Sequence, residues 1–107
     1  MDYEKVILDL IEFRNSRNWQ KYHNLKSLAI SLNIEASEVL EHFQWSEDPT
    51  ESDNKKDSLE MELADVLTYT FYMCEKLGVN PMDLVEKKLN MNKNRKWKFS
   101  EPEKQDE

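Results

Sequence analysis

The chain has 107 residues, enough for one small domain but not for two. Its formal net charge of −7 argues against non-specific nucleic-acid binding, which needs a basic surface, so we expect no nucleic-acid partner. The apolar runs are too short to cross a bilayer, no signal-like segment follows Met1, and Cys74 is the lone cysteine, so we expect a cytoplasmic protein without disulfides or a membrane partner.

Helix-breaking residues are rare, because the chain holds one glycine, three prolines and few β-branched residues. The composition therefore predicts an all-α domain, which we place over residues 1–98. Residues 99–107 are acidic and polar, and we expect them to form a disordered tail.

The first helix is predicted to begin at Asp2, a suitable N-cap, and to end near residue 17. The polar segment 18–24 that follows carries Trp19, Tyr22 and His23. A connecting loop seldom needs so much aromatic surface unless something packs on it. Its aromatic residues are therefore candidates for ligand contact.

Apolar residues at close to heptad spacing predict a second helix over residues 25–44, and a single apolar stripe predicts a third over residues 57–77. Residues 46–56 between them form a polar loop. Gly78 then ends the third helix as a left-handed cap, and Asn80 with Pro81 starts a fourth that fades near residue 96.

Two acidic pairs at the same spacing distinguish the second and third helices: Glu35 with Glu38, and Glu62 with Asp65. Spacing of i, i+3 places each pair on one helix face, at the edge of the apolar stripe. If the two helices pack antiparallel, the pairs face each other across a groove.

Acidic residues at this spacing are usually a solvated helix face. Here both pairs border the core, where an uncompensated charge is costly. Residues 35–65 also hold eleven acidic residues against two lysines. A divalent cation would compensate them, and an all-oxygen site favours Mg²⁺ or Mn²⁺. The Glu-x-x-His pattern of di-iron bundles is missing, so redox iron is not expected.

A basic face on the fourth helix complements the acidic pairs. Lys88, Asn92 and Arg95 are spaced i, i+4, i+7 and share one side of that helix. Such a face would bind phosphate oxygens opposite a metal site, although cations near a helix C-terminus also complement the helix dipole. Trp19 and Trp45 could stack on a nucleobase, although aromatic residues of helical proteins are usually core or dimer contacts.

These motifs together resemble the MazG-like nucleoside triphosphate pyrophosphohydrolases. The resemblance rests on Trp19 and His23, on the run from Glu35 through Phe43-Gln44-Trp45, on Glu62-Leu63-Ala64-Asp65, and on the segment from Lys88 to Arg95. It extends over about residues 5–97. The closest branch is the small single-domain group that includes the dCTP pyrophosphatases.

The resemblance implies a four-helix MazG-like bundle, assembled as a homodimer or homotetramer, that hydrolyses (d)NTP to the monophosphate and pyrophosphate with Mg²⁺. By position in the motifs, the implied metal ligands are Glu35, Glu38, Glu62 and Asp65. The implied nucleotide contacts are Trp19, His23, Trp45 and Tyr69, and the implied phosphate contacts are Lys88, Asn92 and Arg95. Leu10 stands where the family pattern has a polar residue or His, so the resemblance does not predict the base.

The expected mechanism is a metal-assisted attack of water on the α–β phosphoanhydride, with Glu38 or Glu41 orienting that water or accepting its proton. The expected role is removal of surplus or non-standard nucleotides. Two alternatives remain open: an all-α dUTPase-like hydrolase with a similar acidic cluster, and a non-catalytic helical interaction module whose acidic faces are only solvated.

Overall fold

The computed structural model describes residues 2–95. These residues form four α-helices and one 3₁₀ turn: α1 (Tyr3–Ser16), η1 (Gln20–Tyr22), α2 (Leu25–Glu41), α3 (Asp53–Leu77) and α4 (Pro81–Asn94). The prediction of an all-α chain with four helices is confirmed. None of the described helices is long and apolar enough to cross a membrane. The predicted tail over residues 99–107 lies outside the described residues.

The helix ends follow the predicted capping residues at most positions. Asp2 accepts a hydrogen bond from the backbone N–H of Lys5, and Asn80 caps α4 with Pro81 in its first turn. Gly78 adopts φ 70° at the end of α3, a left-handed conformation that strains residues with a Cβ.

Two helix ends differ from the prediction. The helix α3 begins at Asp53, a turn earlier than predicted, because Ser52 serves as its N-cap. The helix α2 ends at Glu41, because the N–H groups of Phe43 and Gln44 donate to the carbonyls three residues before them, at 2.9 and 3.1 Å. This tighter pattern is typical of the last turn of a helix.

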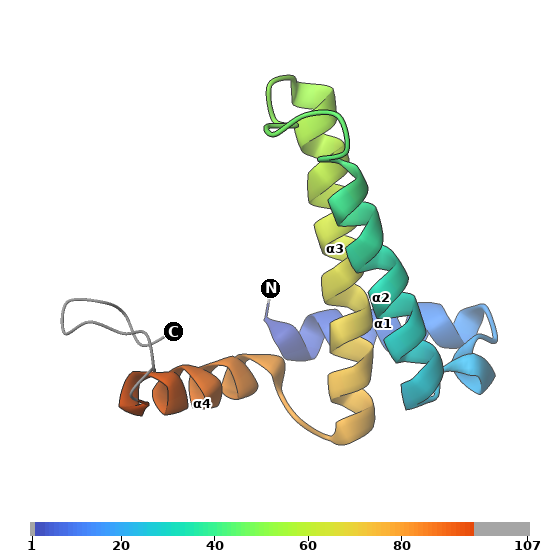
Figure 1. Ribbon diagram of the computed structural model, residues 1–107. Coiled ribbons are helices and arrows are strands. Elements are labelled where there is room, and N and C mark those ends of the chain that lie inside the picture. The colour runs from blue at the N-terminus through green and yellow to red at the C-terminus, as the bar shows by residue number, and fades with distance from the viewer. Residues whose placement is uncertain (1, 96–107) are drawn as a thin grey trace.

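The helices α2 and α3 lie side by side and antiparallel, and α1 crosses the lower half of α3 (Figure 1). Ile7 of α1, Leu28 of α2 and Tyr72 of α3 meet in the buried core. That core lies nearer the start of α2 and the end of α3 than the acidic pairs do. It therefore fixes the relative position of α2 and α3 at one end of the groove between them.

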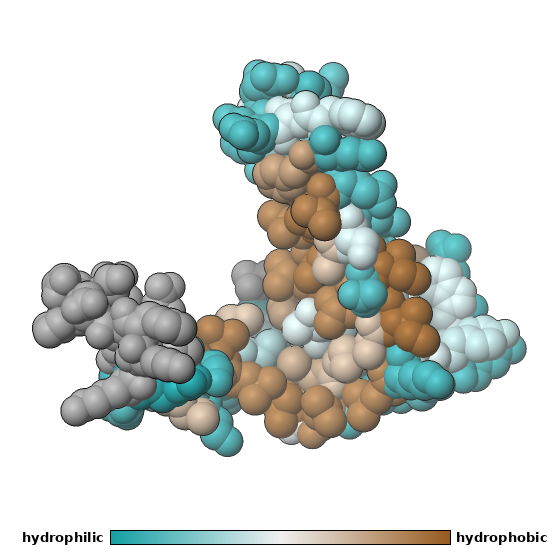
Figure 2. All heavy atoms as spheres, viewed as in Figure 1, coloured by the Kyte–Doolittle hydropathy of each residue, from teal (hydrophilic) through white to brown (hydrophobic). Residues whose placement is uncertain are grey.

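The helix α4 extends away from the α2–α3 pair and makes few contacts with α3 (Figure 1). Its apolar side chains stay exposed, and Val85 retains 67% of its accessible surface. Apolar residues also remain open along α2 and α3 (Figure 2), among them Ile34, Leu40 and Leu67. The four helices therefore do not close into a bundle within one chain.

Candidate functional site

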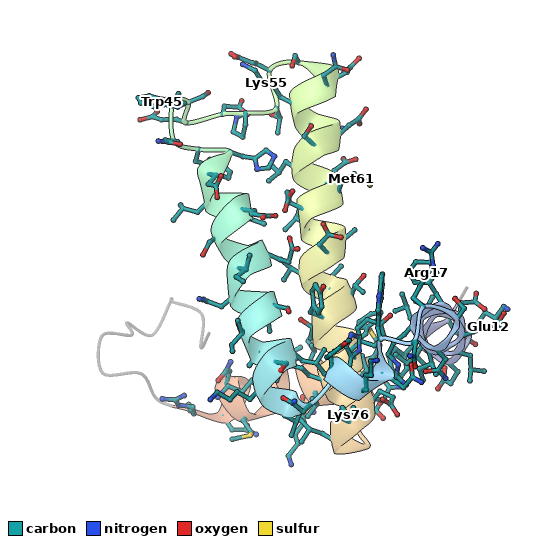
Figure 3. The ribbon with its side chains drawn as sticks, turned by 90° about the vertical axis from the view of Figure 1, so that its right-hand side faces the viewer. Glu12, Arg17, Trp45, Lys55, Met61 and Lys76 are labelled. Carbon is teal, nitrogen blue, oxygen red and sulfur yellow. The ribbon has the colours of Figure 1, made fainter. Side chains whose placement is uncertain are left out.

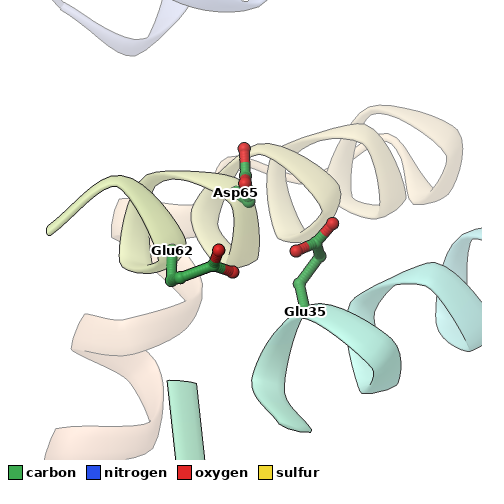
Figure 4. A group of neighbouring side chains, drawn as sticks. All are labelled: Glu35, Glu62 and Asp65. Atoms are coloured by element: carbon green, nitrogen blue, oxygen red, sulfur yellow. The ribbon is translucent and has the colours of Figure 1, made fainter. Parts of the chain in front are cut away.

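Three carboxylates from two helices converge in the groove between α2 and α3. Glu35 of α2 and Glu62 and Asp65 of α3 each present an oxygen, and these oxygens lie within 4.8 Å of one another (Figure 4). Helical spacing puts Glu62 and Asp65 on one face of α3, and the antiparallel packing brings Glu35 opposite them. The structure thus brings together three of the four predicted metal ligands in one cluster.

The fourth predicted ligand, Glu38, lies beside this cluster. A hydrogen bond with Glu38, then burial and the nearby carboxylate charges, raise the pKa of Glu35 from 4.5 to about 7. A hydrogen bond with Glu38 is also the largest cause that raises the pKa of Glu62. The neighbouring carboxyl groups therefore make Glu35 and Glu62 harder to ionise than isolated glutamates.

The chemistry of this cluster fits a hard divalent cation. Glu35 Oε2 and Glu62 Oε2 are both buried without a hydrogen-bond partner among the described residues. An unpaired buried carboxylate oxygen is costly, and a bound cation removes that cost. Because all the available donors are oxygens, Mg²⁺ and Mn²⁺ suit the site better than metals that prefer nitrogen or sulfur ligands.

Beyond the cluster, the groove opens into a polar cleft of about 360 Å³ lined by Glu38, Glu41, His42 and Glu62. Glu41 is exposed at the last position of α2. The Nδ1 atom of His42 lies 2.8 Å from the carbonyl oxygen of Glu38, which holds the imidazole against the end of the helix. Both carboxylates that were predicted to act on the attacking water therefore line one cleft beside the predicted metal ligands.

On the other side of the cluster lies an aromatic pocket of about 320 Å³. Its lining residues are Trp19, Tyr22, His23, Ser27, Leu28, Ser31 and Tyr69. Ser31 lies four residues before Glu35, and Tyr69 lies four residues after Asp65, so pocket and cluster are one helical turn apart on the same faces. The two form consecutive parts of one groove.

The turn after α1 positions the aromatic side of this pocket. Asn18 adopts φ 59°, which reverses the chain, and the N–H of Trp19 donates to the carbonyl of Arg14 at 3.1 Å. The indole of Trp19 then packs edge-on against Phe13, with ring centroids 5.5 Å apart. An aromatic pocket built this way can hold a flat heterocycle beside a metal-bound group.

A family model described as the MazG-like family matches residues 30–107. The chain belongs to the MazG-like family. It is 30% identical over 89 residues to dCTP pyrophosphatase 1 of Homo sapiens, a match that covers 78% of this chain and 52% of that protein. The mouse protein of the same name is 29% identical over the same length. This MazG-like chain thus spans about half the length of the curated relatives it matches.

A solved structure supports the same assignment. The crystal structure of a pyrophosphatase from Archaeoglobus fulgidus DSM 4304 shares 40% sequence identity with this MazG-like chain, with a TM-score of 0.73. The superposed part covers 87% of this chain and 91% of the archaeal one. The described helices therefore have the arrangement found in this archaeal pyrophosphatase.

Four predicted site residues of this MazG-like protein lie apart from the groove within one chain. Trp45 is 89% exposed and lies in the loop at the far end of the α2–α3 pair from Arg17 and Lys76 (Figure 3). The other three, Lys88, Asn92 and Arg95, are on or next to α4. The helix α4 starts just after the C-terminal end of α3. That end of α3 lies beside the aromatic pocket, at the opposite end of the groove from Glu38.

The prediction from sequence missed two groups of residues near the pocket. Ser27 and Ser31 line it with their hydroxyl groups, and their i, i+4 spacing in line with Glu35 was the available signal. Arg14 and Tyr72 lie beneath His23 in the core. The available signal for Arg14 was its spacing, because it lies seven, four and three residues after Ile7, Leu10 and Ile11 and so shares their apolar face.

Proposed function

We propose that this protein is a Mg²⁺-dependent nucleotide pyrophosphohydrolase that converts a (d)NTP and water to (d)NMP and pyrophosphate, and that it clears surplus or non-standard nucleotides. One observation carries the proposal: an acidic cluster suited to a divalent cation adjoins an aromatic pocket in the same groove. The names of the similar human, mouse and archaeal proteins, all pyrophosphatases, support the same reaction class and make dCTP the first substrate to test.

In this proposal the aromatic pocket holds the nucleobase. Trp19 and Tyr69 offer flat faces for stacking, and stacking is worth about 1–3 kcal/mol per base. His23, Ser27 and Ser31 provide the polar atoms that meet the edge of the base or the sugar. With the base in the pocket, the triphosphate runs along the groove past Glu35 and Asp65 toward Glu38.

The acidic cluster would hold the cation through Glu35, Glu62 and Asp65, with Glu38 beside them. Mg²⁺ there would supply Lewis-acid activation of the phosphate oxygens and of the attacking water. Glu38 or Glu41 orients the water and accepts its proton, because both line the cleft at the phosphate end of the groove. Attack of this water on either the α or the β phosphorus breaks the α–β phosphoanhydride and gives the monophosphate and pyrophosphate.

We further propose that the active form is a homodimer or a homotetramer built from dimers. Within one chain, α4 lies at the pocket end of the groove, whereas the phosphates would lie toward Glu38. Lys88, Asn92 and Arg95 would therefore contact the phosphates of a nucleotide that is bound to a second copy. The exposed apolar residues of α4, α2 and α3 favour burial between copies. Trp45 would reach a nucleotide in the same way.

Pyrophosphate release from a panel of dNTPs, measured with Mg²⁺ and with EDTA, tests the proposal. We expect turnover that depends on Mg²⁺ and that is lost in Glu38→Gln while the helical circular-dichroism spectrum is unchanged. A clear preference for dUTP would instead favour the dUTPase-like alternative. No turnover of any nucleotide by the folded, metal-loaded protein would leave only a non-catalytic interaction module.

A further inference from the structure

Arg14 is the one buried charged side chain among residues 2–95, with 7% of its surface exposed. Its Nη1 atom lies 3.6 Å from Oε1 of Glu75, and its guanidinium carbon lies 5.7 Å from the centre of the Tyr72 ring. Burying a guanidinium is expensive even beside a carboxylate, and an apolar side chain of similar volume is often as stable. Stability alone therefore gives little reason for an arginine here.

Tyr72 connects this arginine to the aromatic pocket. Its hydroxyl donates a hydrogen bond to the carbonyl of Leu10 at 3.0 Å, which fixes one end of the side chain. Its ring packs edge to face with the imidazole of His23, with centroids 4.7 Å apart and planes at 65°. Arg14, Tyr72 and His23 thus form a continuous stack from the core to the pocket wall.

We propose that Arg14 is a positioning residue of the aromatic pocket, and that through the ring of Tyr72 it fixes the imidazole of His23 in the orientation that a bound nucleobase meets. The identity of the ligand rests on the proposed function, whereas the effect of Arg14 on His23 does not. No contact of Arg14 with substrate is required.

The electrostatic surroundings of His23 support this role. Burial, followed by the positive charges of Arg14 and Lys76, lowers the pKa of His23, so the imidazole is uncharged at neutral pH. The Nδ1 atom is buried without a hydrogen-bond partner among the described residues, and a polar ligand edge would satisfy it. The titratable and charged groups around this stack are Arg14 of α1, Tyr22 of η1, and Tyr69, Tyr72, Glu75 and Lys76 of α3. The residues of α2 that line the pocket, Ser27, Leu28 and Ser31, are uncharged.

Two substitutions separate the charge of Arg14 from its shape. Arg14→Met removes the charge, so the pKa of His23 should rise and its ring should lose a fixed orientation. Arg14→Lys keeps the charge but loses the planar guanidinium over Tyr72, so the pKa of His23 should stay low while the ring signals change. In both variants KM should rise about tenfold with kcat within about twofold, because ground-state and transition-state binding of the base weaken together.

The test is a titration of the imidazole NMR signals of His23 in the ligand-free protein, followed by KM and kcat for the best nucleotide. His42 provides an internal reference, and Lys5→Met is the matched control, because it removes a cation from the exposed face of α1. An unchanged His23 titration and unchanged ring shifts in folded Arg14→Met would overturn the proposal, as would a fall in kcat at constant KM.

If both arginine variants unfold, Glu75→Gln decides the question. Glu75 is partly exposed, and this substitution removes only the negative charge that pairs with Arg14. Changed His23 ring shifts with a raised KM support the proposal, and unchanged shifts and KM contradict it. If the wild-type protein hydrolyses no nucleotide, the proposed function fails, while the NMR titration still shows whether Arg14 fixes His23.

Discussion

Glu35 of α2 and Asp65 of α3 bring carboxylate oxygens within 4.8 Å of each other, although they belong to different helices. Glu62 completes the same cluster one turn away on α3. Like charges at this separation repel strongly in a partly desolvated groove. The packing of α2 on α3 therefore holds the carboxylates together against their own repulsion, which is the condition under which cation binding is most favourable.

Removing one carboxylate from the cluster should weaken Mg²⁺ binding. We expect Glu62→Gln to lower the affinity at least about tenfold, because one anionic ligand oxygen and its negative charge are lost. Isothermal titration calorimetry measures the effect directly. Glu60→Gln, on the exposed face of the same helix, is the matched control and should bind Mg²⁺ like the wild type. Equal affinities in the two variants would exclude Glu62 as a ligand.

The stability of the metal-free protein should depend on the protonation of Glu35. Its pKa is about 7 in the folded chain against a usual value of 4.5, so the folded state binds this proton more tightly. The stabilisation is complete below pH 4.5 and is lost as the pH rises toward 7. In EDTA, the free energy of unfolding measured with urea should therefore fall between pH 5 and pH 8.

Two controls sharpen this pH prediction. Glu35→Gln should flatten the decline, whereas Glu12→Gln on the exposed face of α1 should leave it intact. Saturating Mg²⁺ should oppose the decline, because the ion binds the deprotonated carboxylates. A slope of the same size in Glu35→Gln would mean that other groups cause the pH dependence.

Trp19→Ala should weaken nucleotide binding more than it slows the chemical step. Loss of one stacking surface of about 1–3 kcal/mol predicts a KM raised about tenfold or more. Steady-state kinetics of Trp19→Ala and Trp45→Ala, side by side, provide the measurement. A similar rise for Trp45→Ala would require Trp45 to reach the pocket of another copy, since it is 89% exposed in its own chain.

The exposed apolar face of α4 should be needed for association. We expect Leu89→Glu to shift the protein toward a monomer, because it places a charge among side chains that the assembly would bury. Light scattering at micromolar concentration gives the mass. Asn90→Glu adds the same charge at an exposed polar position of the same helix and should leave the mass unchanged. An oligomer that survives Leu89→Glu would place the interface elsewhere.

Local signals in the sequence predicted the helices and the acidic cluster because both depend on short-range geometry. The caps at Asp2, Asn80 and Gly78 act within a few residues, and the structure confirms them. The facing of Glu35 and Asp65 required only the helical period and antiparallel packing across a short loop. These rules need no knowledge of distant contacts.

The position of α4 could not be predicted in the same way. Its apolar face shows that it packs against something, but the helical period does not say whether the partner belongs to the same chain. The placement of Trp45 depended on where α2 ends. The backbone N–H groups of Phe43 and Gln44 bond to carbonyls three residues earlier, so α2 ends sooner than the apolar pattern suggests. The buried position of Arg14 depends on α1 crossing α3, which is a tertiary contact.

The two halves of the acidic cluster are each fixed by the period of one helix, and the connection over residues 42–52 supplies none of the clustered carboxylates. Insertions or deletions in that connection would therefore leave the cluster intact as long as α2 and α3 keep their packing. A single residue inserted between Glu35 and Glu38, in contrast, would turn one carboxylate away from the groove by about 100°. Natural variation in length among relatives should accumulate in the connection and be excluded from both helical segments.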